Sequence, residues 1–116
     1  MNLENYKIKP RSEFVSTGLR GYITCSYAEL VKVFGEPTCT ETSGDGKVDI
    51  EWEMQVEDFD HNAIRPFTIY NWKDYDGGFE ARSNPIYRWH IGGTSGIVSA
   101  YVTEYFNNTL NYSEAV

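Results

Sequence analysis

Strict alternation of apolar and polar residues runs over residues 47–56 and predicts a strand buried on one side. The apolar side carries Val48, Ile50, Trp52, Met54 and Val56. Residues 67–72 and 86–91 are rich in β-branched and aromatic side chains and predict two further strands. A turn is expected at residues 58–62. Residues 73–85, which contain two glycines and a proline, are expected to form a mobile loop.

The first helix is predicted over residues 27–34. Ser26 and Glu29 have the Ser-x-x-Glu spacing of a capping box, in which each side chain satisfies a free backbone amide of the other. Apolar residues then recur at helical spacing along one face. Gly35 favours a helix end, and Pro37 prevents continuation.

A second helix is expected over about 96–110, with Thr94 or Ser95 as its N-cap. Weaker strand patterns occur at residues 5–9 and 20–24. Successive antiparallel strands with two helices predict an α+β fold in a single domain, residues 1–116. The expected architecture is a two-layer sandwich: an antiparallel sheet of at least three strands with two helices on one face. The other face would then be left to solvent or to a partner.

The charge of the chain is concentrated in one segment. The formal net charge is −7, and residues 41–60 hold eight acidic residues and one lysine, so the rest of the chain is neutral. Direct binding of nucleic acid is not expected, because cations are needed to displace counterions from phosphates.

No feature of the sequence indicates a membrane, a metal or a cofactor. The N-terminal residues lack the apolar run of a signal peptide, and no stretch has the length of a membrane span. Cys25 and Cys39 lack the spacing of metal ligands, so we expect a cytoplasmic protein with two reduced thiols. Signatures of nucleophilic or metal-dependent hydrolysis are absent from the sequence, and we therefore expect no catalytic residues.

The first candidate site is the face of the sheet opposite the apolar side. Tyr70, Trp72, Arg88 and His90 would gather there. Aromatic rings beside an arginine and a histidine suit stacking on a planar ligand and hydrogen bonding to its edges. The alternative is a solvated face with cross-strand pairs and no ligand.

A second candidate follows the third strand. Gly92 and Gly93 precede Thr94 and Ser95 at the expected start of the last helix, where backbone amides favour anions. The alternative is a tight turn that needs positive φ at Gly92 or Gly93.

The third candidate is a stripe of carboxylates from the acidic segment, and it would dock a basic protein surface or mimic nucleic acid. Its candidate residues are Asp49, Glu51, Glu53, Glu57 and Asp58. A solvated strand face is the alternative.

Five blocks of the sequence resemble a family of small proteins found largely in bacteriophage genomes. They are LRGYI at 19–23, YAELVKVFGEP at 27–37, KVDIEW at 47–52, TIYNWKD at 68–74 and WHIGG at 89–93. In that family a short Asp-Gly turn separates the two central strands. The connection here, residues 57–65, is longer and argues against a simple hairpin.

The resemblance implies a context. Small non-enzymatic phage proteins often counter host defences by binding. One expectation is therefore an accessory protein in the host cytoplasm that sequesters a nucleotide immune signal. The alternatives are an acidic inhibitor of a host defence protein and a virion or housekeeping component. The sequence leaves open whether the chain forms a homo-oligomer.

Overall fold

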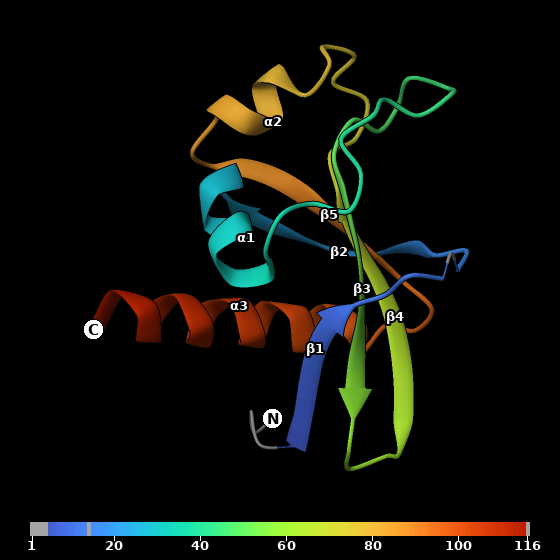
Figure 1. Ribbon diagram of the computed structural model, residues 1–116, viewed down its shortest axis with the longest axis vertical. Coiled ribbons are helices and arrows are strands. Elements are labelled where there is room, and N and C mark those ends of the chain that lie inside the picture. The colour runs from blue at the N-terminus through green and yellow to red at the C-terminus, as the bar shows by residue number, and fades with distance from the viewer. Residues whose placement is uncertain (1–4, 14, 116) are drawn as a thin grey trace.

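The computed structural model describes residues 5–13 and 15–115 and has an α+β fold, as expected (Figure 1). Its strands are β1 (Tyr6–Pro10), β2 (Gly18–Cys25), β3 (Glu51–Asp58), β4 (Ala63–Tyr70) and β5 (Tyr87–Gly93). Its helices are α1 (Tyr27–Phe34), α2 (Phe79–Ser83) and α3 (Val98–Ala115). The strands form one antiparallel sheet in the order β1-β3-β4-β5-β2.

Strands β3 and β4 form a direct hairpin, contrary to the expectation from the long connection. Pairing continues to Asp58 opposite Ala63, which leaves only residues 59–62 as the loop. Asn62 adopts a left-handed conformation with φ of 49°, which asparagine tolerates better than most residues. The additional residues of the connection therefore lengthen both strands and leave a short turn.

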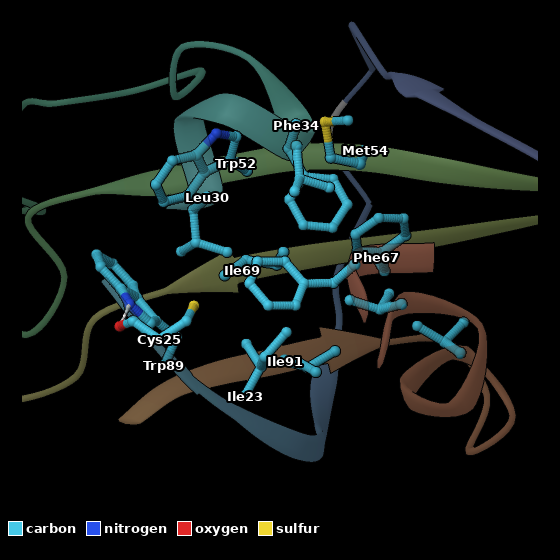
Figure 2. Packing of buried hydrophobic residues seen from close by; sticks show 14 of the residues in the cluster. Ile23, Cys25, Leu30, Phe34, Trp52, Met54, Phe67, Ile69, Trp89 and Ile91 are labelled. Carbon is cyan, nitrogen blue, oxygen red and sulfur yellow. Dashed lines mark hydrogen bonds between the residues drawn. The ribbon is translucent and has the colours of Figure 1, made fainter. Parts of the chain in front are cut away.

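The core lies against one face of the sheet. Alternation along each strand sends Trp52, Phe67, Ile69, Trp89 and Ile91 to this face, and all of them are buried. Figure 2 shows these side chains packing around Leu30 and Phe34 of α1. Both buried tryptophans also satisfy their indole N–H groups, since Trp52 donates to the carbonyl of Gly35 and Trp89 to that of Cys25.

Helices α1 and α3 contact the apolar side chains of the sheet. Tyr27 of α1 lies 5.9 Å from Trp52, measured between ring centroids, and Phe34 lies 6.3 Å from Phe67. Tyr101 of α3 packs edge to face on Tyr6 of β1, with centroids 4.8 Å apart. The predicted capping box is present, since the Ser26 hydroxyl accepts from the Glu29 amide and Glu29 accepts from the Ser26 amide.

Several element boundaries differ from the expected ones. Residues 47–50 keep the alternating pattern but are not in the sheet, because their backbone amides bond to side chains: Ser43 binds the amide of Val48, and Asn71 binds the next two. The loop expected at 73–85 contains α2. Helix α3 starts at Val98, so neither Thr94 nor Ser95 stands at its N-cap position.

Candidate functional site

The open face of the sheet, opposite the apolar one, carries a row of side chains that crosses four strands. Tyr70 of β4 pairs with Glu51 on one side and with His90 of β5 on the other, and His90 pairs with Tyr22 of β2. Side chains of directly paired residues lie on the same face of a sheet. Trp72 follows Tyr70 by two residues and adds a fourth ring to what we call the aromatic cluster: Tyr22, Tyr70, Trp72 and His90.

His90 is the centre of the aromatic cluster. Its ring centroid lies 4.9 Å from that of Tyr22, 5.4 Å from that of Tyr70 and 6.0 Å from that of Trp72. The cluster is not covered, since Tyr22 is 44% exposed and Trp72 is 38% exposed. Two large rings therefore face solvent on either side of the histidine.

Arg88 is held on the Tyr22 side of the cluster. Its guanidinium carbon lies 4.1 Å from the centroid of the Tyr22 ring, which is a cation–π contact. Arg88 and His90 are two positions apart on β5 and so share the open face. The arginine is exposed and keeps its donors available for a ligand.

Two lysines lie near the Trp72 ring. The ammonium nitrogens of Lys47 and Lys73 are 5.8 Å and 5.5 Å from its centroid. The backbone brings the lysines together, because the amide of Lys73 donates to the carbonyl of Lys47 over 2.7 Å. Lys73 and Tyr75 both have left-handed φ, 57° and 56°, which is uncommon for such residues and marks a loop constrained by its surroundings.

A buried hydrogen-bond network fixes the loop that carries Trp72. The side-chain oxygen of Asn71 accepts from the amides of Asp49 and Ile50, at 2.7 Å and 2.9 Å, and its nitrogen donates to the carboxylates of Asp49 and Asp74. Tyr87 donates to Asp74 and accepts from the amide of Trp72. The network therefore positions Trp72 on the open face while Asn71, its neighbour, is completely buried.

The electrostatics of the site favour a neutral His90. Burial, and next the charge of Arg88, lower the pKa of His90, so its ring is uncharged at neutral pH. Its Nδ1 atom is buried and has no hydrogen-bond partner within the described part of the chain. An unpaired buried nitrogen is costly, but because this atom is shielded from solvent, a ligand on the open face does not reach it.

Glu51 lies opposite Tyr70, on the β3 side of the aromatic cluster. Burial, and next the neighbouring Glu53, raise the pKa of the Glu51 carboxyl above its ordinary value. The same carboxylate contributes, after burial, to a raised pKa of Tyr70. The open face is thus cationic around Arg88 and the two lysines and acidic along β3.

Gly92 and Gly93 do not lie in a turn at the start of the last helix, so their expected placement in the second candidate site is wrong. Gly92 and Gly93 are the last residues of β5, and neither has positive φ, so the expected tight turn is also wrong. A side chain at Gly92 would clash, because a Cβ atom would lie 2.5 Å from Thr68 Oγ1 and 2.8 Å from Thr17 Oγ1. The glycine thus lets the segment before β2 approach the sheet. Thr94 and Ser95 follow the end of β5, opposite the end that carries Arg88.

The acidic stripe is interrupted. Asp49 is 1% exposed and bonded to Asn71 and Thr42, and Asp58 is 2% exposed. Glu57 forms an ion pair of 2.6 Å with Lys9. Only Glu51 and Glu53 of the five candidate carboxylates therefore lie half-buried on the open face without an ion pair of their own among the described residues.

Asp58 is instead the centre of a second polar cluster. Burial alone would raise its pKa, but hydrogen bonds from Tyr101, His61 and Arg65 outweigh that effect and hold the pKa far below its ordinary value. The bond from Tyr101 joins the β3–β4 hairpin to α3, and those from His61 and Arg65 lie within the hairpin.

Sequence reasoning missed Tyr22, Lys47 and Lys73. Tyr22 belongs to a short pattern at residues 20–24 whose pairing partner the alternation does not reveal. The lysines reach Trp72 only through the left-handed loop and its backbone bond to residue 47. The one available signal was Lys73 itself, directly after Trp72 in the sequence.

Among the described residues, no helix has the length and apolar character needed to cross a membrane. The same part of the chain contains no group of three His, Cys, Asp or Glu side chains arranged to hold a metal ion. No family model, curated protein or solved structure matches this chain.

Proposed function

We propose that this protein is a non-enzymatic binding protein that holds a nucleotide-type ligand on the aromatic cluster. Following the sequence resemblance to bacteriophage proteins, we further propose that it counters a host defence by sequestering a nucleotide signal. A protein that sequesters a nucleotide needs a binding site but no catalytic groups. A cluster of stacking rings and cations meets that requirement.

One observation carries the proposal: exposed aromatic rings and cationic side chains lie together on the open face of the sheet. A nucleotide combines a planar base, a polar base edge and an anion. Trp72 offers a stacking surface, and Arg88 and the two lysines offer positive charge. Arginine in particular presents a planar fork of donors that matches phosphate.

Direct binding measurements test the proposal. Ribonucleoside monophosphates and dinucleotides are titrated individually into the full chain by isothermal titration calorimetry. Stacking contributes about 1–3 kcal/mol per base, so Trp72→Ala should weaken binding about 10- to 100-fold. Arg88→Ala should cause a loss of similar size, because it removes a charge-assisted pair.

Matched controls separate binding from folding. Trp72 is partly exposed, so its truncation should lower the melting temperature by only a few degrees, unlike truncation of buried Trp52 or Trp89. Phe79→Ala removes an exposed ring outside the aromatic cluster and should change neither the nucleotide affinity nor the melting temperature. The proposal fails if no nucleotide binds at millimolar concentration, or if the Trp72 variant binds like wild type.

The alternative, docking of a basic host protein on the acidic residues, rests on Glu51 and Glu53. Replacing both with lysine distinguishes the two modes. An anionic ligand on the neighbouring cluster should bind more tightly to the double variant, because two repulsive charges are removed. A basic protein partner should bind it more weakly and with less dependence on salt.

A further inference from the structure

The aromatic cluster contains two separate pairings of a ring with positive charge. The first, the Tyr22–Arg88 pairing, spans β2 and β5, with the guanidinium over the tyrosine ring. The second, the Trp72–lysine pairing, lies beyond the end of β4 and has Lys47 and Lys73 near the indole. Each pairing combines a stacking surface with a partner for an anion.

One planar group cannot use both pairings. Tyr22 and Tyr70 belong to strands with β5 between them, so they lie about 10 Å apart in the sheet, and the Trp72 ring lies 6.0 Å from both Tyr70 and His90. Ring orientation differs as well. The His90 ring makes an angle of 80° with Tyr22 but only 39° with Trp72. A base parallel to one surface is therefore inclined to the other.

The Tyr22–Arg88 pairing offers the guanidinium plane itself as its stacking surface. Arg88 covers a face of the Tyr22 ring, so a base would lie on the arginine, which bases use as they use aromatic rings. Tyr22 then acts as a positioning residue for the Arg88 guanidinium. His90 lies between the two pairings, with its ring 4.9 Å from that of Tyr22 and 6.0 Å from that of Trp72.

Two sides of the open face are unfavourable for further nucleotides. Glu51 and Glu53 lie along its β3 side, where phosphates would be repelled. Towards the other end of β5, Thr17 contacts Thr68 over Gly92, with the hydroxyl oxygens 3.3 Å apart, and this covers the sheet. Arg11 of the same connecting segment donates to Gln55 on β3. Room for bases on the sheet is thus limited on the β3 side and towards Gly92.

We infer that the ligand is a dinucleotide, with one base on Trp72, the other on the Arg88 guanidinium, and the linking phosphate between them. This inference rests on the proposed function and narrows its ligand class. Two splayed bases on two surfaces match the way single-stranded nucleotides are bound on sheet faces.

Calorimetry on the full chain tests the inference with matched ligands: the four ribonucleoside monophosphates, linear 3′–5′ dinucleotides, cyclic dinucleotides and single-stranded decamers. At least one dinucleotide, linear or cyclic, should bind 1:1 with a dissociation constant at least tenfold lower than that of its own mononucleotides, because a second base stacks. Comparison of the linear and cyclic dinucleotides identifies which phosphate linkage fits beside His90.

Variants then assign the two surfaces. Tyr22→Leu and Trp72→Leu should each weaken dinucleotide binding about tenfold, and a mononucleotide should respond to only one of them. Tyr22→Phe keeps the ring under Arg88 and should retain affinity. Arg88→Lys keeps the positive charge but removes the planar guanidinium, so this variant should lose affinity. Unchanged melting temperatures show that each variant is folded.

Two outcomes overturn the inference while leaving the proposed function intact. In the first, a mononucleotide binds as tightly as every dinucleotide, and binding responds to Trp72→Leu alone. In the second, decamers bind more tightly than any dinucleotide, with several protein molecules on each strand, which would indicate a polymer ligand. If none of the ligands binds, the proposed function itself fails.

Discussion

At the residue scale, Asn71 has the largest structural role near the cluster. Its amide group is fully buried and makes four hydrogen bonds, two to backbone amides and two to carboxylates. Only an amide side chain supplies an acceptor for the first two and donors for the second two. Because Trp72 is the next residue, the same bonds determine where its ring lies.

Asn71→Ala should lower the free energy of unfolding by about 3 kcal/mol or more, because several buried polar groups lose their partner at once. Asn71→Asp keeps the acceptor but places a third carboxylate beside Asp49 and Asp74. Its destabilisation at pH 7 should decrease as pH falls, since protonation removes the repulsion. Chemical denaturation at pH 7 and pH 5 measures both effects. A loss for Asn71→Asp that is independent of pH would contradict this role.

At the element scale, alternation predicted which side of β3 is buried but not where the strand begins and ends. The apolar side of residues 47–56 faces the core from Ile50 onwards, because one-sided burial imposes a period of two. Burial of Asp49 and Asp58 was not predictable. Their partners Asn71 and Tyr101 lie 22 and 43 positions away, and short-range patterns carry no information on such pairs.

The same reasoning explains how much of the site was predictable. Tyr70 and His90 share a face because β4 and β5 are consecutive strands with clear patterns. Tyr22 joins them only because β2 pairs with β5 at the edge of the sheet, a topology that depends on the whole fold. Gly92 and Gly93 suggested a turn, yet they are strand residues that make room for Thr17 and Val98.

A further prediction at this scale concerns Asp58, which links the β3–β4 hairpin to α3. Its pKa is lower in the folded than in the unfolded chain, so its contribution to stability is present above about pH 4 and is lost as pH falls below that value. Asp58→Asn should cost about 2 kcal/mol at pH 7, because charge-assisted hydrogen bonds from Tyr101 and Arg65 are lost. The free energy of unfolding of the Asp58→Asn variant should also change less between pH 5 and pH 2 than that of the wild-type protein. Equal acid dependence of the two proteins, measured by urea denaturation, would show that Asp58 is not the responsible group.

At the scale of the whole molecule, the sign of the charge differs between the protein and its candidate site. The net charge is −7, but Arg88 lies over Tyr22, and Lys47 and Lys73 lie near Trp72, so three cations surround the aromatic cluster. Such a distribution weakens general attraction to nucleic acid, while the local cations favour a small anion. The proposed function depends on this contrast, because the acidic protein as a whole repels nucleic acid while the cations around the aromatic cluster attract a small anion.

The three indole N–H groups give the most direct test of nucleotide binding on the aromatic cluster. In a ¹H–¹⁵N spectrum, the indoles of Trp52 and Trp89 are fixed by hydrogen bonds inside the core, whereas Trp72 lies on the open face. Titration with dinucleotides should move the Trp72 indole signal and the backbone signals of Arg88 and His90, and should leave the two core indoles in place. If all three indole signals stay unchanged at saturating ligand, or if the shifts gather away from β5 and Trp72, the account is wrong.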